Sequence, residues 1–580
     1  MTQNRAIAER FAQIADMLEI KGESIFRINA YRRAARAVES LTEDIAAVAA
    51  RGELTTLPGI GASMAEKIEE FLRTGTMRAY EELAASLPPG LVTLMRVPEV
   101  GPKTALLLYE KLGITTLDDL EAAAKAGRIR QLPRMGAKTE ENILRGIAML
   151  RRSGERRPLG VVLPVAEELV AMLRAVEGVR AIEVAGSLRR RKETVGDIDI
   201  LVTSTAPSRV MDAFVAAPSV TQVLSHGPTR SSVVLTVGLQ ADLRVVEPAS
   251  YGAALQYFTG SKEHNVALRE RAVRRGLKIN EYGVWRTKDN RRVAGRDEAE
   301  VYGAVGLPWI PPELREDQGE LDAAEAGRLP RLIELADVRG DLHMHTKWSD
   351  GAESVEAMAE AAKALGYEYI CITDHSQSLK VAGGVTIPDL RRHATQVRAL
   401  SDRLGIEVLI GTECDILADG SLDYPDEVLA DLDVVIASVH TRFRMSREEM
   451  TRRIIRAMER EQADIIGHPT GRLLGARDPY EVDVEAIVDA AARTGTVLEL
   501  NASPERLDLK DAHVRLARER GVLIEIGTDA HQTAHLRHMV LGVSVARRGW
   551  LEAKDVINTR PLAKLRDLLG RHPAKPRRRR

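Results

Sequence analysis

Cysteine and long apolar runs are scarce in the sequence, and each absence excludes a class of protein. Only Cys371 and Cys414 are cysteines among 580 residues, which excludes the disulfide framework of a small secreted domain. No run of about 18 apolar residues occurs, which excludes a membrane-spanning helix. Met1–Arg10 is charged and has no apolar signal core. We therefore expect a cytoplasmic protein with no membrane partner.

The net charge is also close to zero, at −1, but the arginine and lysine residues are unevenly distributed along the chain. Four arginines fall within residues 151–157, Arg189–Lys192 is a second basic run, and Arg577–Arg580 is a third. Such clusters suit a polyanionic partner, because each neutralised phosphate releases counterions. For the run at 577–580, a solvated tail is an equally good interpretation.

The length predicts about three to five domains, and the residue pattern changes twice along the chain. Up to about residue 150, glycine punctuates short helical patterns such as Ile25–Val38 and Met64–Leu72. A helical pattern at Val165–Val176 then precedes Val/Ile-rich strands such as Ala181–Ala185, which is typical of an α+β unit. Gly306–Arg331, rich in proline and acids, has the composition of a linker. Beyond it, strands and helices alternate as in a parallel α/β layer or barrel.

One short pattern occurs three times in the N-terminal region, at Leu57–Gly61, Val97–Gly101 and Leu132–Gly136. Each copy combines a proline with a final glycine and leads into an amphipathic helix. The tight turn leaves backbone N–H groups of the next helix free, so these segments look like helix-hairpin-helix motifs that grip phosphates. One copy could be an ordinary turn between packed helices, but three copies beside cations favour DNA binding. The residues expected to contact DNA are Gly59, Gly61, Val97, Glu99, Gly101, Lys103, Gly136 and Lys138.

A first catalytic pattern lies in the α+β region. Strand alternation puts Asp197 and Asp199 on one face. Two adjacent carboxylates repel unless a cation separates them, so we expect Mg²⁺ or Mn²⁺ there. Asp242 lies in a later strand that could pair beside the first. Three carboxylates can hold two ions for in-line phosphoryl transfer.

A glycine-serine turn precedes these acids. Ser187 and the backbone N–H groups after Gly186 would hold phosphate oxygens, and Arg190 would add positive charge. An isolated Asp-x-Asp is more often a solvated strand end, but this turn and the later Asp242 disfavour that interpretation.

From about residue 10 to residue 310, the sequence resembles the family X DNA polymerases. The resemblance rests on the patterns above and on Tyr257–Ser261, Asn265, Arg269 and Ile279–Tyr282. It implies that Asp197, Asp199 and Asp242 are the catalytic metal ligands. The nucleotide-binding residues that it implies are Gly186, Ser187, Arg190, Gly196, Tyr257, Phe258, Gly260, Asn265 and Arg269. Contacts to the sugar, base and template among these are needed only by a templated polymerase.

Departures from the family pattern bear on function. Lys262 stands where the family has an acid near the incoming base. Lys67 matches the catalytic lysine that removes 5′-deoxyribose phosphate, but two lysines that would support it are here Arg27 and Ser63. A lyase needs a lysine with a lowered pKa, to which nearby cations contribute. A lyase lysine and a solvated helix lysine therefore both stay open as interpretations of Lys67.

The C-terminal region carries a second set of acids and histidines, nearly all after Val/Ile-rich runs such as Tyr369–Ile372, Val434–Ala437 and Val522–Ile526. The carboxyl ends of strands are where α/β barrels carry their sites. A lone histidine would more often be structural, but this many converging imidazoles and carboxylates suit Zn²⁺, Mn²⁺ or Fe²⁺. Alternation also predicts His343 and His345 on one strand face. The set consists of His343, His345, Asp350, His375, Glu413, His440, His468, Asp529 and His531.

Residues from about 337 to 560 resemble the polymerase-and-histidinol-phosphatase (PHP) domain, and this set occupies all nine positions of its ligand pattern. The resemblance implies up to three ions. Their ligands would be His343, His345, Glu413 and Asp529 for the first, Glu413, His440 and His468 for the second, and Asp350, His375 and His531 for the third. Cys371 and Cys414 adjoin ligands but fit no position, so they are interpreted as core residues.

Together the two resemblances imply a multidomain chain of the bacterial and archaeal branch of family X. Its parts would be an all-α helix-hairpin-helix region, an α+β nucleotidyltransferase palm and a distorted (β/α)7-type PHP barrel. The expected boundaries are 1–82 for the N-terminal helical domain, 83–155 for a second helix-hairpin-helix domain, 156–248 for the catalytic palm, 249–312 for the nucleotide-selection subdomain, 313–336 for a linker, 337–572 for the PHP domain and 573–580 for a basic tail.

The resemblance implies a monomeric, nucleoid-associated repair enzyme. It would fill gapped or nicked DNA from deoxynucleoside triphosphates and degrade DNA 3′→5′ in the PHP domain, with abasic-site cleavage and 3′-phosphate removal as further family activities. Two alternatives stay open: a PHP domain that is only a metal-stabilised scaffold, and a small-molecule phosphatase fused to a nucleotidyltransferase. The complete ligand set argues against the first. The three hairpin repeats argue against the second, since a small substrate needs no backbone grip.

Overall fold

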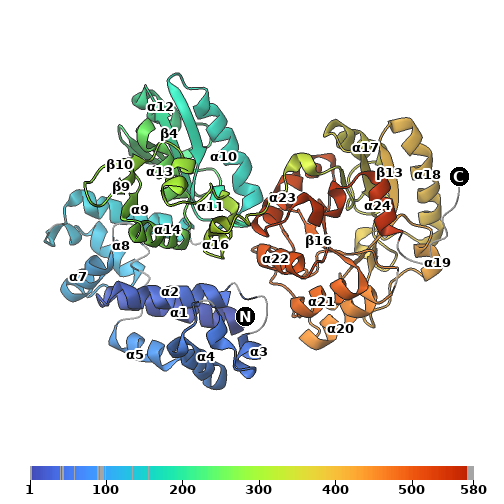
Figure 1. Ribbon diagram of the computed structural model, residues 1–580, viewed down its shortest axis with the longest axis horizontal. Coiled ribbons are helices and arrows are strands. Elements are labelled where there is room, and N and C mark those ends of the chain that lie inside the picture. Colours follow the sequence, from blue (N-terminus) through green and yellow to red (C-terminus); the bar gives the residue numbers. More distant parts are fainter. Residues whose placement is uncertain are drawn as a thin grey trace. The chain divides into compact units, whose positions relative to one another are not determined.

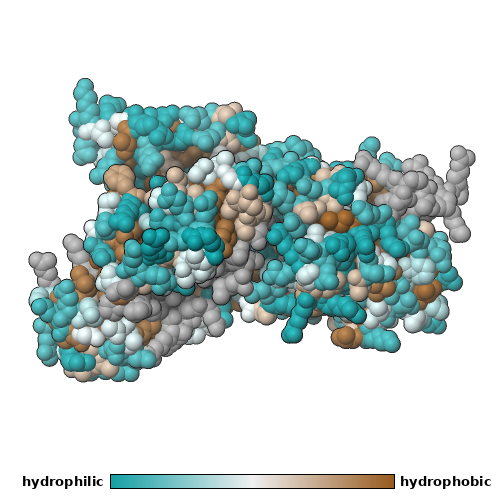
Figure 2. All heavy atoms as spheres, turned by 90° about the horizontal axis from the view of Figure 1, so that it is seen from below, coloured by the Kyte–Doolittle hydropathy of each residue, from teal (hydrophilic) through white to brown (hydrophobic). Residues whose placement is uncertain are grey.

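The computed structural model describes residues 3–39, 41, 45–57, 59–87, 91, 94, 97, 100–133, 135–153, 156–460 and 462–570. The chain forms two compact units, Met1–Glu155 and Arg156–Arg580 (Figure 1). The face drawn in Figure 2 is mainly hydrophilic, with apolar residues scattered over it. In the described part of the chain, no helix is long and apolar enough to cross a membrane.

The first unit is built from helices around two apolar cores. The first core lies among α1 (Gln3–Ile20), α2 (Ile25–Glu39), α3 (Ile45–Ala50), α4 (Ala62–Thr74) and α5 (Arg78–Ser86). The second lies among α7 (Pro102–Leu112), α8 (Leu117–Lys125) and α9 (Ala137–Ser153). Each repeated proline-glycine pattern leads directly into one of these helices, namely α4, α7 and α9, as the sequence predicted.

A five-stranded sheet begins the second unit and forms the palm. Its strands, in spatial order, are β2 (Val179–Val184), β4 (Ile198–Ser204), β7 (Gln240–Val245), β6 (Arg230–Leu235) and β5 (Val220–His226). Helices α10 (Leu159–Arg174) and α12 (Pro207–Val215) pack against it through side chains such as Leu163 and Phe214. Strands β4 and β7 run parallel, and a short ribbon of β1 (Arg157–Pro158) and β3 (Thr194–Val195) lies beside α10.

The next part of the second unit follows the five-stranded sheet in the chain. It contains α13 (Tyr251–Thr259), α14 (Lys262–Arg274) and α15 (Glu298–Ala304), with a small antiparallel sheet of β8 (Leu277–Asn280), β9 (Gly283–Arg286) and β10 (Arg292–Ala294).

Residues 313–336, for which composition predicted a linker, are a packed connection instead. They include α16 (Glu320–Glu325), and Leu321 lies in the same apolar core as Tyr302 of α15. Glu320 is fully buried against His264, with Oε1 2.6 Å from Nδ1. Glu313 accepts a hydrogen bond from Arg547 at 2.7 Å. Two of the acids that suggested a solvated segment, Glu313 and Glu320, are therefore paired with a half-buried arginine and a buried histidine, which composition alone does not reveal.

Seven parallel strands form the core of the C-terminal domain in simple sequential order: β11 (Gly340–Asp341), β12 (Tyr369–Ile372), β13 (Glu407–Asp415), β14 (Val434–Ser438), β15 (Ile465–Ile466), β16 (Val497–Asn501) and β17 (Ile524–Gly527). A parallel bridge between Met344 and Ala530 joins the two ends of the sheet, so it nearly closes into a barrel. Cys371 and Cys414 are buried in its strands, as predicted.

The helices of this domain surround the strands (Figure 1). They are α17 (Val355–Ala364), α18 (Ile387–Leu404), α19 (Asp426–Leu429), α20 (Arg447–Met458), α21 (Val484–Thr494), α22 (Asp511–Glu519), α23 (Met539–Arg548) and α24 (Leu562–Leu569). Because helices cover the outside and side chains fill the inside, the strands are apolar on both faces, as in β12, where every residue is buried.

Candidate active sites

Two neighbouring palm strands carry the three predicted carboxylates. Asp199 on β4 lies opposite Asp242 on β7, and Asp197 directly precedes β4. Burial, and then the charges of Asp197 and Asp242, raise the pKa of Asp199 to about 7. Burial and the charge of Asp242 also raise the pKa of Asp197. Carboxylates that destabilise one another in this way repel less when a divalent cation binds between them.

A short helix beside these acids contains the predicted phosphate turn. Helix α11 (Gly186–Arg189) follows β2, and Gly186 has a φ of 62°. A Cβ at Gly186 would lie 3.2 Å from Oδ2 of Asp199, so glycine permits both the left-handed backbone and the close approach. Ser187 is the second residue of the same helix. The predicted phosphate contacts and metal ligands are therefore neighbours.

Arg190 lies at the end of α11 and is held on two sides. Its Nε donates to Oε1 of Glu316 at 3.0 Å, and its Nη1 donates to the carbonyl of Thr259. Gly260 follows with a φ of 70°, and a Cβ there would lie 3.1 Å from Nη1 of Arg190. A Cβ at Gly196 would lie 3.2 Å from Nη1 of Arg156. Both predicted glycines therefore lie close to arginines.

The predicted sugar, base and template residues gather on α13 and α14. The rings of Tyr257 and Phe258 meet edge to face, with centroids 5.2 Å apart. Asn265 donates to the carbonyl of Tyr257 at 2.8 Å and accepts from Gln256 at 2.6 Å. Nε of Arg269 donates to the carbonyl of Asn265 at 3.1 Å. These side chains thus form one connected set.

In the barrel, Glu413 on β13 lies at the centre of the predicted ligands. Its Oε2 lies 3.4 Å from Nε2 of His343, 3.5 Å from Nε2 of His345 and 3.0 Å from Nδ1 of His375. Its Oε1 lies 3.2 Å from Nε2 of His440 and 2.8 Å from Nε2 of His468. One carboxylate therefore faces two sets of imidazoles through its two oxygens.

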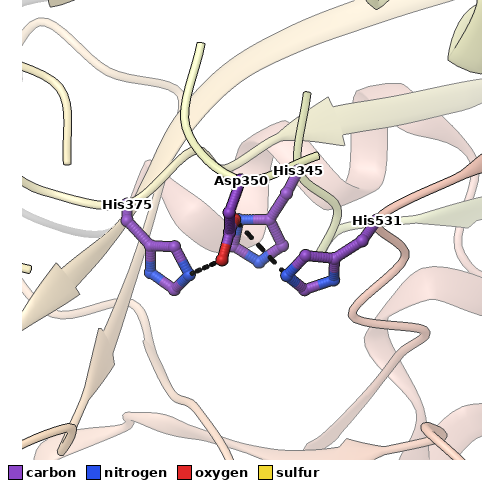
Figure 3. A group of neighbouring side chains, drawn as sticks. All are labelled: His345, Asp350, His375 and His531. Carbon is purple, nitrogen blue, oxygen red and sulfur yellow. Dashed lines mark ion pairs between the residues drawn. The ribbon is translucent and has the colours of Figure 1, made fainter. Parts of the chain in front are cut away.

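A second group surrounds Asp350, with His375 and His531 on either side of it (Figure 3). The Asp350 oxygens lie 3.5 Å from Nε2 of His375 and 3.4 Å from Nε2 of His531. The ring of His345 stacks on both histidines at 4.4 Å between centroids.

Nδ1 of His345 is buried without a hydrogen-bond partner, a costly arrangement unless the nitrogen binds something. Burial, and then the charge of His375, lower the pKa of His345 to about 4, so its imidazole is in the neutral form that binds metals. The residues fit a metal centre.

Eight of the nine predicted ligands supply donor atoms to three groups, each within 4.8 Å: His345, Asp350, His375 and His531; His343, His345 and Asp529; and His375, Glu413 and His440. His468 belongs to none of these groups. The predicted partition gave each histidine to one ion, whereas here His345 and His375 each belong to two groups. The predicted strand across 341–346 is also shorter than expected, since β11 ends at Asp341. The Nε2 atoms of His343 and His345 nevertheless lie 3.3 Å apart.

Similarity to known proteins covers the whole of this architecture. Family models match at residues 2–77 (helix-hairpin-helix domain), 91–148 (SAM-like helix-hairpin-helix tandem), 254–316 (DNA polymerase beta thumb) and 341–503 (PHP domain). The chain is 39% identical over 562 residues to the DNA polymerase/3′-5′ exonuclease PolX of Bacillus subtilis (strain 168), covering 96% of this chain and 98% of that protein. The chain belongs to the family X DNA polymerases that carry a PHP domain.

Other relatives of this family X polymerase align with about a third of the chain, its PHP part. It is 31% identical over 231 residues to a "probable phosphatase" of Thermoanaerobacter sp. (strain X514), covering 38% of this chain and 89% of that protein. It is 34% identical over 201 residues to a "probable phosphatase" of Acetivibrio thermocellus, covering 33% and 78%.

The lyase candidate of the polymerase, Lys67, lies on α4. Its Nζ donates to the carbonyl and to the hydroxyl of Ser63, both at 2.9 Å, and lies 5.9 Å from the centre of the Tyr31 ring. Ser63, one of the departures from the family pattern, is therefore a direct partner of Lys67.

The predicted DNA-contacting residues of the three hairpins differ in exposure. Val97 is buried, and Glu99 and the side chain of Lys103 lie outside the described residues. Gly59 makes the first turn with a φ of 89°. Those exposed to solvent are Gly59, Gly61, Gly101, Gly136 and Lys138.

Sequence reasoning missed the residues that hold the barrel ligands. Glu499 on β16 lies 2.5 Å from Nδ1 of His343 and accepts the backbone N–H of His468. Asp415 lies 2.6 Å from Nδ1 of His440. The available signal was a carboxylate between apolar residues of a strand, as in Val497–Asn501, because a fully buried acid needs a partner.

Proposed function

We propose that this family X polymerase is a two-site DNA repair enzyme that fills short gaps and trims DNA 3′→5′. The proposal is supported by one observation above all: the second unit brings two carboxylates opposite each other on palm strands, and it groups eight of the nine predicted donors in the barrel, with the ninth, His468, 2.8 Å from Glu413. The relative from Bacillus subtilis, aligned over nearly the whole chain, is named for both activities.

In the palm, Asp197, Asp199 and Asp242 would hold Mg²⁺ or Mn²⁺. Such ions, when bound, supply charge stabilisation for in-line phosphoryl transfer. Arg190 would hold the triphosphate, because its guanidinium offers a planar set of N–H donors that suits phosphate oxygens, and its charge acts on Asp197. Tyr257 and Asn265 would select the sugar and the base.

In the barrel, the nine donors would hold up to three Zn²⁺, Mn²⁺ or Fe²⁺ ions. When bound, these ions supply Lewis-acid activation for phosphodiester hydrolysis. Glu413 would serve two ions, because its two oxygens face different histidines, and Glu499 would fix the ring orientation of His343. Abasic-site cleavage and removal of 3′-phosphates would use the same centre.

The substrates would be gapped or nicked DNA and deoxynucleoside triphosphates. The hairpin turns of the first unit present exposed glycines before helices, which favours contacts to the DNA backbone. Lys67 would supply lyase activity only if its bonds to Ser63 are released.

A second candidate deserves a direct comparison, because the PHP relatives are named probable phosphatases. In that case the barrel would act on small phosphate esters and leave DNA intact. A barrel that only stabilises the polymerase through bound metals is the remaining alternative.

The test uses a 5′-phosphorylated one-nucleotide gap with a labelled primer and Mn²⁺, with and without nucleotides. Asp199→Ala should lose extension and still shorten the primer, and His343→Ala should do the reverse. Free sugar and amino-alcohol phosphates are assayed in parallel. A wild-type enzyme that extends primers but never degrades DNA would overturn the exonuclease, and hydrolysis of small esters alone would favour the phosphatase.

A further inference from the structure

One residue of the PHP barrel reaches the nucleotide turn of the palm. Arg548 is the last residue of α23, and its side chain is 4% exposed. Its Nη1 donates to Oε1 of Glu316 at 2.9 Å and to the backbone carbonyl of Arg190 at 2.8 Å. Its Nε and Nη2 donate to Asp511 of the barrel at 2.8 and 2.6 Å. A single guanidinium thus joins the barrel to the residue placed to hold the triphosphate.

Glu316 is shared between the two arginines. Its Oε1 accepts from Nε of Arg190 at 3.0 Å as well as from Arg548, and Lys192 lies 3.9 Å away. Burial acts to raise the pKa of Glu316, but the charges of Arg548, Arg190 and Lys192 lower it to about 2. The carboxylate is therefore ionised, and its charge is divided between a palm arginine and a barrel arginine.

The same turn is fixed at its other end by a second barrel arginine. Arg472 donates to Glu193 at 2.8 Å and to the carbonyls of Arg506 and Leu507. Residues 190–193 are therefore held by the barrel at both ends, through Arg548 and through Arg472. Such a double attachment keeps the backbone of a short loop in one position.

We propose that Arg548 is a positioning residue of the polymerase site, acting from within the PHP barrel on Arg190. The proposal rests on the proposed function, in which Arg190 binds the triphosphate. With Arg548 in place, Glu316 has two cationic partners and the Arg190 carbonyl has a fixed donor. Without it, the full charge of Glu316 acts on Arg190 and competes with the triphosphate for the same guanidinium.

The adjacent residue of α23 provides a matched control. Arg547 also bonds to the connection between thumb and barrel, but its partners are Glu313 at 2.7 Å and the carbonyl of Ile333 at 2.9 Å. Arg547→Ala removes a cation from the same helix and the same contact region, and leaves the bonds of Arg190 in place.

The experiment titrates the incoming nucleotide in steady-state filling of a one-nucleotide gap by the full-length enzyme, with the gapped DNA in excess. Arg548→Ala should raise the KM for nucleotide about tenfold and change kcat by less than about twofold, because Arg190 is mispositioned while the carboxylates are intact. PHP nuclease activity of the same preparation should be unchanged. Arg548→Lys should lie between wild type and Arg548→Ala, and Arg547→Ala should keep the wild-type KM. Glu316→Gln added to Arg548→Ala should recover part of the loss, since the neutral amide no longer competes for Arg190.

Each other outcome contradicts the proposal. An unchanged KM in Arg548→Ala, or an equal rise in Arg547→Ala, would show that Arg548 only fastens the domains together. If Arg548→Ala loses both activities, Arg548→Lys decides, and a wild-type KM in that variant overturns the positioning role. A wild-type enzyme that extends no primer would overturn the proposed function itself, which is a result distinct from an unchanged KM.

Discussion

The palm and the barrel gather acidic ligands in opposite electrostatic ways. In the palm, burial and mutual repulsion raise the pKa values of Asp197 and Asp199. In the barrel, burial also acts to raise the pKa of Glu413, but the charges of His440, His375 and His343 hold it well below its usual range. The palm acids thus destabilise one another, whereas the barrel acids are matched by imidazoles.

The ligands of the two sites also differ in the residues that hold them. In the barrel, Glu499 holds His343, Asp415 holds His440, and Arg506 lies 3.3 Å from Oδ2 of Asp529. In the palm, Asp242 accepts from Gln240 and Arg230, and the charges of Arg156 and Arg190 only partly offset the effects that raise the pKa of Asp197. We infer that the ligands of the barrel are held in position before metals bind. In the palm, the repulsion between the carboxylates is relieved only when cations bind.

The largest expected effect is the loss of polymerase activity alone, through a change in the palm. Asp199→Ala should reduce primer extension by about a thousandfold or more, since a metal ligand contributes several kcal/mol to the transition state. Extension and shortening of one labelled primer are measured in the same gel. Asp212→Ala removes an exposed carboxylate of the same palm, which pairs with His226, and should extend normally. Equal loss in both variants would mean that the effect is not local.

The reciprocal change is one in the barrel that removes nuclease activity alone. Glu413→Gln keeps the shape of a side chain that is 1% exposed but removes the charge facing two sets of imidazoles. Nuclease activity should fall about a thousandfold, and extension should stay within about twofold of wild type. Glu427→Gln, at an exposed position of α19, is the control. A variant that still degrades primers at the wild-type rate would remove the barrel as the nuclease.

Local patterns predicted the parts whose causes are local. The strand at Tyr369–Ile372 was found at its predicted limits, and Asp199 lies on a palm strand with Asp197 directly before it. The helices after the three hairpin patterns were also found. In each case a short run of residues, through its alternation or its turn, decides the outcome.

Pairings between distant residues were not predictable in this way. The predicted linker packs because Glu313 meets Arg547 and Glu320 meets His264, and neither partner lies near it in sequence. The partition of the barrel ligands also depends on where strands end in three dimensions, as the double role of His345 shows. The sequence therefore identifies which residues carry chemistry better than which of them share an ion.

A smaller effect would sharpen the statement that the barrel is organised in advance. Glu499→Gln weakens the hold on Nδ1 of His343 and should lower metal affinity or nuclease rate about 10- to 100-fold. The measurement is nuclease rate against Mn²⁺ concentration. Glu525→Gln is the matched control, because Glu525 pairs with Glu499 across neighbouring strands and both its oxygens are buried without partners. Burial, and then the charges of Glu499 and Asp341, raise the pKa of Glu525 well above its usual value, so a neutral amide should replace it without effect. Identical titrations for Glu499→Gln and wild type would contradict preorganisation through this bond.

The smallest effect concerns stability and tests the palm side of the comparison. The pKa of Asp199 is about 7 when folded and near its usual value of 3.8 when unfolded, so the folded chain holds the proton more tightly. Stability therefore falls as pH rises from about 4 to 7 and stays lower above 7. Asp199→Asn cannot ionise, and in EDTA it should raise the melting temperature by about 2 °C at pH 8 and by less at pH 5. Adding Mn²⁺ should reverse the order, because only the wild-type carboxylate gains from the ion. The gain at pH 8 should be missing in Asp212→Asn, whose carboxylate is 68% exposed. If Asp199→Asn melts at or below the wild-type temperature at pH 8 without metal, the palm acids are not in conflict, and the contrast with the barrel fails.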